Sequence, residues 1–123
     1  MKKIVFSVAI LLGIVFWGNL GETSAQTGRM EWRGTVDDVV QIRIRNRRAN
    51  VRTVSGTAYY DDNANFWDAL PRRRVTVSVD KRDGRGEVFV VQQPNARNNF
   101  TAIVQIVDKK GSRDRYRFIL TWY

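Results

Sequence analysis

The sequence predicts an all-β protein: a small antiparallel β-sandwich of seven to eight strands, immunoglobulin-like or similar, preceded by an N-terminal signal helix. Three observations lead to this fold class. After residue 25, apolar and polar residues alternate with a period of two, helical periodicity is almost absent, and clusters of Gly, Asp, Asn and Pro interrupt the alternation at short intervals. Short strands separated by such turn clusters are typical of two packed sheets.

Residues 1–25 have the layout of a secretory signal peptide. Two lysines follow Met1, the run from Ile4 to Trp17 carries no charge, and a stretch of small and polar residues ends at Ala25. The uncharged run is shorter than the roughly 20 residues with which a helix crosses a bilayer. We therefore expect cleavage after Ala25 and no transmembrane segment in the mature chain, with a retained membrane anchor as the alternative.

The remaining residues, 26–123, are enough for a single β-sandwich domain with one core. They contain no cysteine, so packing and hydrogen bonds alone must hold the fold after export. The whole chain has a formal net charge of +9, and the expected cleavage removes two lysines and one glutamate, so the mature domain stays strongly basic. Together these features predict a secreted, periplasmic or cell-envelope protein of a bacterium.

The alternation predicts seven strands, with an eighth at 57–60 if that segment pairs. The seven cover residues 29–36, 39–45, 51–55, 74–81, 87–92, 99–107 and 115–122. The first two meet at Asp37-Asp38, and the third follows a polar loop. A connection over 56–71, long for a compact domain, carries one expected helical turn at 63–70.

The last four predicted strands form two expected hairpins. Asp83-Gly84 supplies the left-handed backbone of a tight turn between the fourth and fifth strands, and a second turn cluster at 108–112 joins the sixth to the seventh. The fifth strand, 87–92, has apolar side chains on both faces, which predicts a central strand that is covered twice. Pro94 ends it, because proline cannot donate to a strand ladder.

The inward positions of these strands predict the core. It is expected to contain Val40, Ile42, Ile44, Val75, Val77, Val79, Phe100, Val104, Ile106, Phe118 and Leu120. Burying one such side chain contributes roughly 1.5 to 3 kcal/mol, so these residues stabilise a domain without disulfides if they share one interior.

The residue types present argue against catalysis. The chain has no histidine and no cysteine, so the usual general base, the thiol nucleophile and the common zinc ligands are missing. Most of its aspartates fall at predicted turns, where the side chain bonds the nearby backbone. The stretch that begins at Asp61 fails as a calcium loop, since Phe66 and Arg72 replace its essential glycine and final acid. We therefore expect no enzyme activity, no cofactor and no metal site.

Aromatic residues in the long connection have two candidate roles. Tyr59, Tyr60 and Trp67 form a candidate ligand platform, because a flat ring offers stacking area to a sugar or a base. Phe66 and Leu70 lie four residues apart and are expected to plug the open end of the sandwich. The sequence leaves both roles open.

Arginines supply most of the positive charge and are the candidate binding residues. Eight are expected to engage an anionic partner: Arg43, Arg45, Arg47, Arg72, Arg73, Arg74, Arg115 and Arg117. Four of them occupy outward positions of strands 39–45 and 115–122, so a continuous stripe forms if these two strands are neighbours. Such a stripe binds polyanions by releasing counterions. The alternative is that these arginines only keep the strands soluble and prevent edge pairing.

These features favour an exported, non-enzymatic binding or structural module. Its expected partner is an anionic surface or polymer, such as lipopolysaccharide, acidic polysaccharide or extracellular DNA. One alternative is a protein-protein interaction or assembly module, an adhesin-like subunit or an inhibitor, that uses an apolar sheet face with Ile103, Val107 and Ile119. A further alternative is a small carbohydrate-binding domain built on the aromatic platform.

Overall fold

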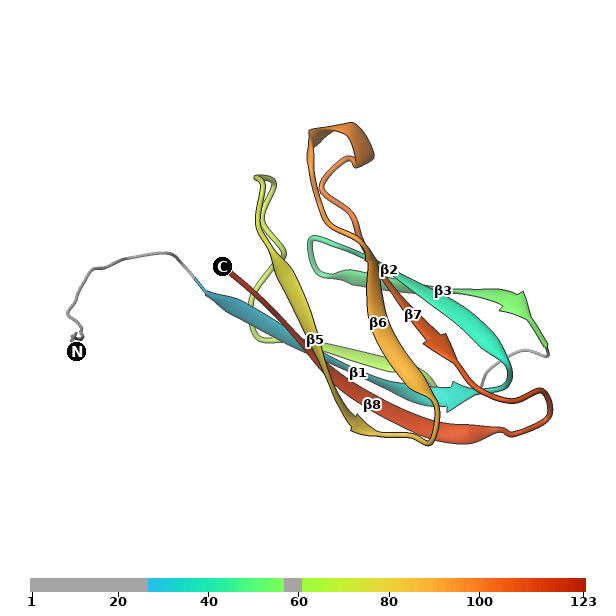
Figure 1. The fold of residues 1–123 in the computed structure, drawn as a ribbon. Helices are drawn as coiled ribbons and strands as arrows, with labels where there is room; N and C mark the ends of the chain where they lie inside the picture. Colours follow the sequence, from blue (N-terminus) through green and yellow to red (C-terminus); the bar gives the residue numbers. More distant parts are fainter. Residues whose placement is uncertain (1–26, 57–60) are drawn as a thin grey trace, which may run out of the picture.

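The computed structural model describes residues 27–56 and 61–123, which form two antiparallel four-stranded sheets (Figure 1). The strands are β1 (Gly28–Val36), β2 (Val39–Arg45), β3 (Arg48–Ser55), β4 (Asn63–Phe66), β5 (Val77–Asp83), β6 (Glu87–Gln92), β7 (Ala102–Val107) and β8 (Asp114–Trp122). A short 3₁₀ helix, η1 (Ala96–Asn98), precedes β7. The predicted all-β class is confirmed. The expected signal helix and the candidate strand at 57–60 lie outside the described residues.

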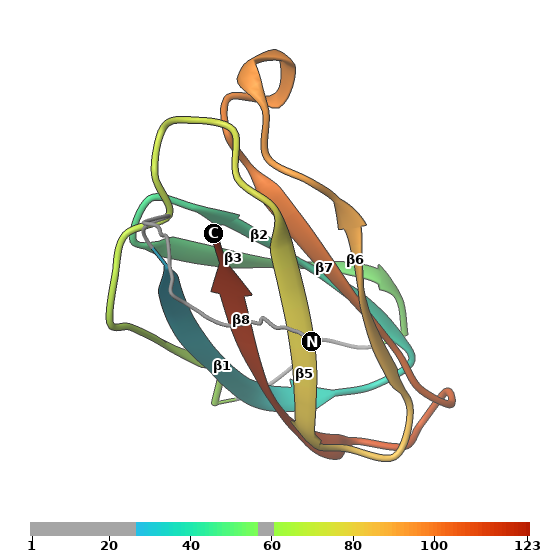
Figure 2. The same ribbon diagram turned by 60° about the vertical axis from the view of Figure 1, so that its left-hand side comes forward.

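The first sheet has the strand order β4-β1-β8-β5 and the second has the order β3-β2-β7-β6. The two sheets pack face to face around one core (Figure 2). Among the described strands, only the consecutive pairs β2–β3 and β6–β7 are hydrogen-bonded neighbours, and most other connections cross from one sheet to the other. The first sheet therefore depends on the pairing of β1 with β8, from opposite ends of the domain sequence.

The prediction of two hairpins in the second half of the chain is wrong, because neither hairpin forms. β5 and β6 flank the Asp83-Gly84 turn but pair with β8 and β7 respectively, and β7 and β8 belong to different sheets. Gly84 has a φ of 122°, so the turn does require the backbone freedom of glycine. A turn of this kind can close a hairpin or connect two sheets, because its residues do not specify the strand with which each arm pairs.

Two further elements differ from the prediction. Asn63–Phe66 is strand β4 and not a helical turn: it pairs with β1 and packs Ala64 and Phe66 against the core. β6 is an edge strand of the second sheet and not a central one. Its Phe89 and Val91 are 37% and 44% exposed, so the apolar residues on its outward face are not covered by the described part of the chain.

The core consists of inward residues from both sheets. Most of the expected core residues are buried, whereas Val79 is only partly buried and Phe100 lies in the loop after η1 with a φ of 56°. The core also contains large side chains that were not in the expected set. Among them, Trp32 of β1 stacks on Phe118 of β8 with ring centroids 5.6 Å apart. This contact joins the two central strands of the first sheet.

The connections gather at two ends of the sandwich that differ in charge. At one end, which we call the basic end, the β2–β3, β4–β5 and β6–β7 connections lie together; they carry Arg47, Arg72, Arg73, Arg74 and Arg97 against one acid, Asp68. At the other, the mixed end, aspartates of the remaining connections lie among lysines and arginines. Positive charge is therefore concentrated at one end of the molecule.

Candidate functional site

The outward face of the second sheet carries four exposed arginines that we call the arginine strip: Arg43 and Arg45 on β2, and Arg48 and Arg52 on β3. The aliphatic residues of β2 between these positions are buried, so the arginines point away from the core. In the register of the two strands, Arg45 lies opposite Arg48, and Arg43 and Arg52 occupy successive rows. The four guanidinium groups therefore project from one continuous area.

No member of the arginine strip has an acidic partner among the described residues. The ion pairs that the described part of the chain does form lie outside the strip. They join Arg82 to Asp80 at 3.1 Å, Arg85 to Asp114 at 3.9 Å, and Arg117 to Glu31 at 2.8 Å. Within the strands of the second sheet, the acid on this face is Glu87, on the far edge strand β6. Neighbouring like charges repel each other, so a bound anion relieves this repulsion.

The basic end extends the positive area beyond the strip. Arg47 occupies the turn between β2 and β3, and its Nη1 donates to the carbonyl oxygen of Phe66 at 3.3 Å. The N–H of Leu70 donates to the carbonyl oxygen of Asn46 at 2.9 Å, which holds the β4–β5 connection against the same turn. Three consecutive exposed arginines, 72–74, follow in that connection. Six of the eight expected binding residues thus belong to the strip or to the neighbouring basic end.

The other two expected residues, Arg115 and Arg117, lie on the outward face of the first sheet. They line a hollow of about 400 Å³ together with Arg33 and two aspartates. Arg117 Nη1 also donates to Glu31 Oε2 at 2.8 Å. The condition for a continuous stripe, that the strands of Arg43 and Arg115 are neighbours, is not met, because β2 pairs with β3 and β7 while β8 pairs with β1 and β5. The arginines of β2 and β8 therefore do not form one stripe.

The apolar residues expected on one sheet face are divided in the same way. Ile103 and Val107 are on β7 of the second sheet, whereas Ile119 is on β8 of the first sheet. All three occupy outward positions of their strands, and the outward faces of the two sheets point in opposite directions. A single apolar face containing all three is therefore absent from the described fold.

Arg48 and Arg52 were not among the expected binding residues. The sequence prediction placed a polar loop over 46–50, whereas β3 already begins at Arg48. A signal was present in the sequence, since apolar and polar residues alternate from Arg48 to Arg52 and Asn46 is a residue type that tolerates positive φ; in the structure it has a φ of 57° in the turn. A hairpin closed by Asn46 and Arg47 places both missed arginines beside β2.

Of the candidate aromatic platform, only Trp67 is described, because Tyr59 and Tyr60 lie outside the described residues. Trp67 is 45% exposed, and the guanidinium carbon of Arg29 lies 4.5 Å from its ring centroid. One face of this ring is therefore occupied by a cation–π contact and is not free for stacking. Leu70 is buried in the core, and Phe66 packs partly against it from strand β4.

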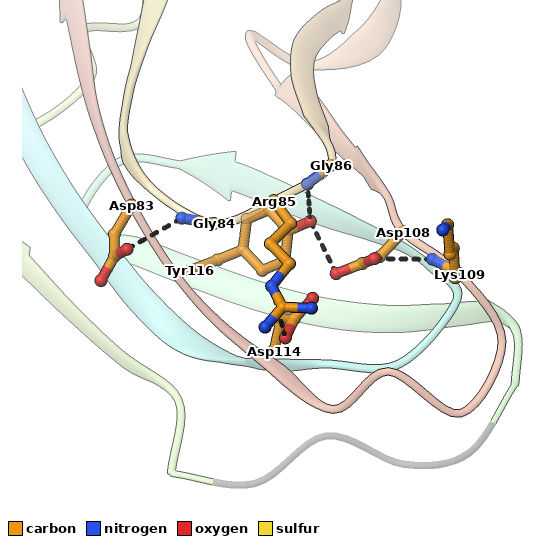
Figure 3. Close-up of polar contacts among 8 residues, drawn as sticks. All are labelled: Asp83, Gly84, Arg85, Gly86, Asp108, Lys109, Asp114 and Tyr116. Atoms are coloured by element: carbon orange, nitrogen blue, oxygen red, sulfur yellow. Dashed lines mark hydrogen bonds and ion pairs between the residues drawn. The ribbon is translucent and has the colours of Figure 1, made fainter.

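A polar cluster surrounds Tyr116 at the mixed end (Figure 3). The Tyr116 hydroxyl donates to Asp108 Oδ2 at 2.7 Å and accepts from the N–H of Gly86 at 2.5 Å. Asp114 lies beside this pair, with its carboxylate 3.9 Å from Arg85. The hydroxyl thus ties the β5–β6 connection to the β7–β8 connection.

The electrostatics of this cluster fit a structural role. Burial, and then the hydrogen bond to Asp108, raise the pKa of Tyr116, so its hydroxyl remains a donor at neutral pH. Burial raises the pKa of Asp108, but hydrogen bonds from Tyr116, the backbone of Lys109 and other groups outweigh this, and the net result is a lowered pKa. The pKa of Asp114 is raised, first by its interaction with the Asp108 carboxyl group and then by burial, because two neighbouring carboxyl groups disfavour ionisation of both.

Within residues 27–56 and 61–123, no group of three or more acidic residues is placed to hold a metal ion. No helix in the same ranges is long and apolar enough to span a membrane. Comparison with known proteins found no matching family, no similar curated protein and no similar solved structure. The fold and the site thus define the protein's class: a two-sheet, all-β domain with an arginine strip on one outward face.

Proposed function

We propose that the protein is an exported, non-enzymatic module that binds an anionic surface or polymer through the arginine strip. The observation that supports this most directly is the set of four outward arginines without an acidic partner among the described residues. A guanidinium group offers paired donors that match phosphate, sulfate and carboxylate groups. Arg47 and residues 72–74 extend the same positive area at the basic end.

Export is part of this proposal and rests on the signal-like pattern of residues 1–25. The mature chain, 26–123, acts as one domain in the envelope of a bacterium or outside the cell. The anionic materials there include lipopolysaccharide, acidic polysaccharide and extracellular DNA. The two alternative functions have weaker support, because the expected apolar residues are on different faces and one face of the Trp67 ring is covered.

The test compares two variants that lose the same charge. The strip variant replaces Arg43, Arg45, Arg48 and Arg52 with glutamine. The control variant replaces four exposed cations elsewhere with glutamine: Arg33, Arg82, Lys109 and Lys110. The readout is the dependence of affinity for heparin and for double-stranded DNA on salt concentration.

On double-stranded DNA, each phosphate contact contributes about 0.9 to the slope of log affinity against log salt. We expect the strip variant to lose roughly 3 to 4 units of this slope while the control variant keeps most of it. Equal losses in the two variants would assign binding to net charge alone and would refute a role for the strip. Unchanged binding in the strip variant would refute it as well.

A further inference from the structure

We propose that the anionic partner is the surface of a lipid bilayer, on which the outward face of the second sheet lies flat. This inference rests on the proposed function. It extends the binding surface from the arginine strip to the other half of the same sheet face. We call this half the apolar strip: Phe89 and Val91 on β6, and Ile103 and Val107 on β7. Phosphate headgroups bind the arginine strip, and the apolar strip enters the boundary between headgroups and acyl chains.

The two strips are separated according to the order of the strands. The arginine strip occupies β3 and β2, and the apolar strip occupies β7 and β6, which follow in the same sheet. At the border, Gln41 Nε2 of β2 donates to Gln105 Oε1 of β7 at 2.8 Å. Phe89 lies opposite Gln105 in the register of β6 and β7. The outward face thus carries its arginines on β3 and β2, whereas β7 and β6 carry four apolar residues together with Gln105 and, at one end of β6, Glu87 opposite Val107.

The core does not account for the apolar residues on the outside of β6. Val88 and Val90 pack against the core, whereas Phe89 and Val91 point away from it and are 37% and 44% exposed. Polar residues at these two positions leave the same core contacts intact. An edge strand with exposed apolar residues also carries a risk of aggregation, which proteins usually limit with polar or charged side chains. The outward apolar residues therefore favour a binding role.

A lipid surface complements both the arginine strip and the apolar strip. A soluble polyanion or a second copy of the chain complements only one of them. A soluble polyanion neutralises the arginines but leaves the apolar strip in water. A second copy of the chain, related by a twofold axis through the apolar strip, covers that strip but leaves both arginine strips in water. Glu87 is the acid on this face that is available to pair with them. An anionic bilayer offers phosphate groups and an apolar layer within the same few ångströms.

The first experiment separates lipid binding from binding to a soluble polyanion. Mature protein is mixed with vesicles of phosphatidylglycerol or of phosphatidylcholine, and in parallel with heparin. Phe89→Thr and Val91→Thr are combined in one variant, because threonine is polar and has the β-branched shape that suits a strand. We expect this variant to bind phosphatidylglycerol vesicles at least tenfold more weakly and to bind heparin as tightly as the wild type does.

The strip variant is expected to lose both ligands. Each arginine near an anionic membrane contributes about fivefold in affinity, so the loss of four arginines reduces vesicle binding by several hundredfold. Wild-type protein is expected to bind phosphatidylcholine vesicles weakly, since those carry no net negative charge. Wild-type binding to phosphatidylglycerol that is unaffected by the Phe89 and Val91 substitutions would overturn the lipid inference while leaving the proposed function in place.

The second experiment determines which face meets the bilayer. The chain has no cysteine, so a single introduced cysteine can be labelled with a dye whose emission shifts to the blue in an apolar environment. Val91→Cys places the dye on the apolar strip, and Thr121→Cys places it at an exposed position of β8, on the outward face of the first sheet. We expect a shift at Val91 and none at Thr121 when phosphatidylglycerol vesicles are added.

Several other results would overturn the inference. A shift at both positions or only at Thr121 would show that the bilayer meets another face. Sedimentation as a dimer that the Phe89 and Val91 substitutions convert to a monomer would show that a second copy covers the apolar strip. Heparin binding without vesicle binding would assign the arginine strip to a soluble polymer, and the absence of both would refute the proposed function itself.

Discussion

Arg45 and Arg48 lie directly opposite each other at the end of the β2–β3 hairpin, and neither has an acidic partner among the described residues. Like charges at directly opposed positions of a sheet destabilise it by roughly 0.2 to 1 kcal/mol. Solvent exposure reduces this penalty but does not remove it. A pair placed there therefore lowers stability slightly and concentrates positive charge at the point where the arginine strip meets the basic end.

Arg48→Glu is expected to move stability and binding in opposite directions. The new carboxylate faces Arg45 across the hairpin, so the free energy of unfolding should rise by roughly 0.5 kcal/mol at low salt and return toward the wild-type value at high salt. Heparin affinity should fall, because the strip loses one cation and gains one anion. Urea denaturation at two salt concentrations and elution from immobilised heparin measure the two effects. A variant that is more stable yet elutes with the wild type would contradict a binding role for Arg48.

Tyr116→Phe tests the link between the two connections at the mixed end. The substitution removes the hydrogen bond to Asp108 and leaves the N–H of Gly86 without its acceptor. Loss of a partner for a buried polar group costs about 1 to 3 kcal/mol. For a domain of this size, each kcal/mol lowers the melting temperature by roughly 4 to 8 °C. Thermal denaturation followed by circular dichroism should show a melting temperature that is lower by at least about 4 °C. An unchanged melting temperature would rule out a structural role for the hydroxyl.

Asp108→Asn is expected to reduce stability at neutral pH but not in acid. The pKa of Asp108 is lowered in the folded protein relative to its ordinary value of 3.8. Its contribution to stability is therefore present above that value and disappears as the pH falls through the folded-state pKa. Unfolding curves at several pH values should show the variant below the wild type at pH 7 and the two converging at the most acidic pH. A constant difference across pH would point to packing and not to the charge.

Asp114→Asn is expected to behave in the opposite way. The pKa of Asp114 is raised, so its favourable contribution is present below 3.8 and disappears as the pH rises through the raised pKa. Above that pH both carboxylates are charged and repel each other. Asparagine removes the charge and keeps a donor for Asp108, so the variant should be more stable than the wild type at pH 7 and lose this advantage in acid. Equal or lower stability at pH 7 would show that repulsion between the Asp108 and Asp114 carboxylates does not weaken the folded protein.

The fold class could be predicted from the sequence because strand alternation is a local property. Val40 and Ile42 on β2, and Phe118 and Leu120 on β8, point inward as their spacing predicts. Strand pairing is not local, and the prediction failed there. The turn at Gly84 has the expected backbone geometry but connects strands of different sheets. A single sequence contains no direct information about which distant strands pair.

For the candidate site, too, the local features could be predicted and the features that depend on strand pairing could not. Arg43 and Arg45 could be assigned to one outward face from their spacing alone, and the structure places them there. Grouping them with Arg115 required knowledge of strand order, and that grouping is wrong. The exposure of Phe89 also depends on strand order, since apolar residues on both faces of a strand fit a central strand as well as an edge strand that binds a partner.

Gly84→Ala and Gly111→Ala form a matched pair that tests how the mixed end is built. Both glycines have positive φ, 122° and 81°, so alanine is strained at either position. A Cβ atom at Gly111 meets no other atom within 4 Å, whereas at Gly84 it would overlap the Tyr116 ring. We expect Gly111→Ala to cost about 1 to 2 kcal/mol from backbone strain alone, and Gly84→Ala to cost clearly more. Urea denaturation gives both values.

The pair also predicts a coupling between Gly84 and Tyr116. If the alanine methyl group displaces the Tyr116 ring, the hydroxyl loses its contacts with Asp108 and Gly86 before any mutation of the tyrosine. Tyr116→Phe should then destabilise the Gly84→Ala background by much less than it destabilises the wild type, with a coupling energy of about 1 kcal/mol or more. In the Gly111→Ala background it should keep its full effect. Additive losses at Gly84 would mean that the ring stays in place and that the backbone alone absorbs the strain.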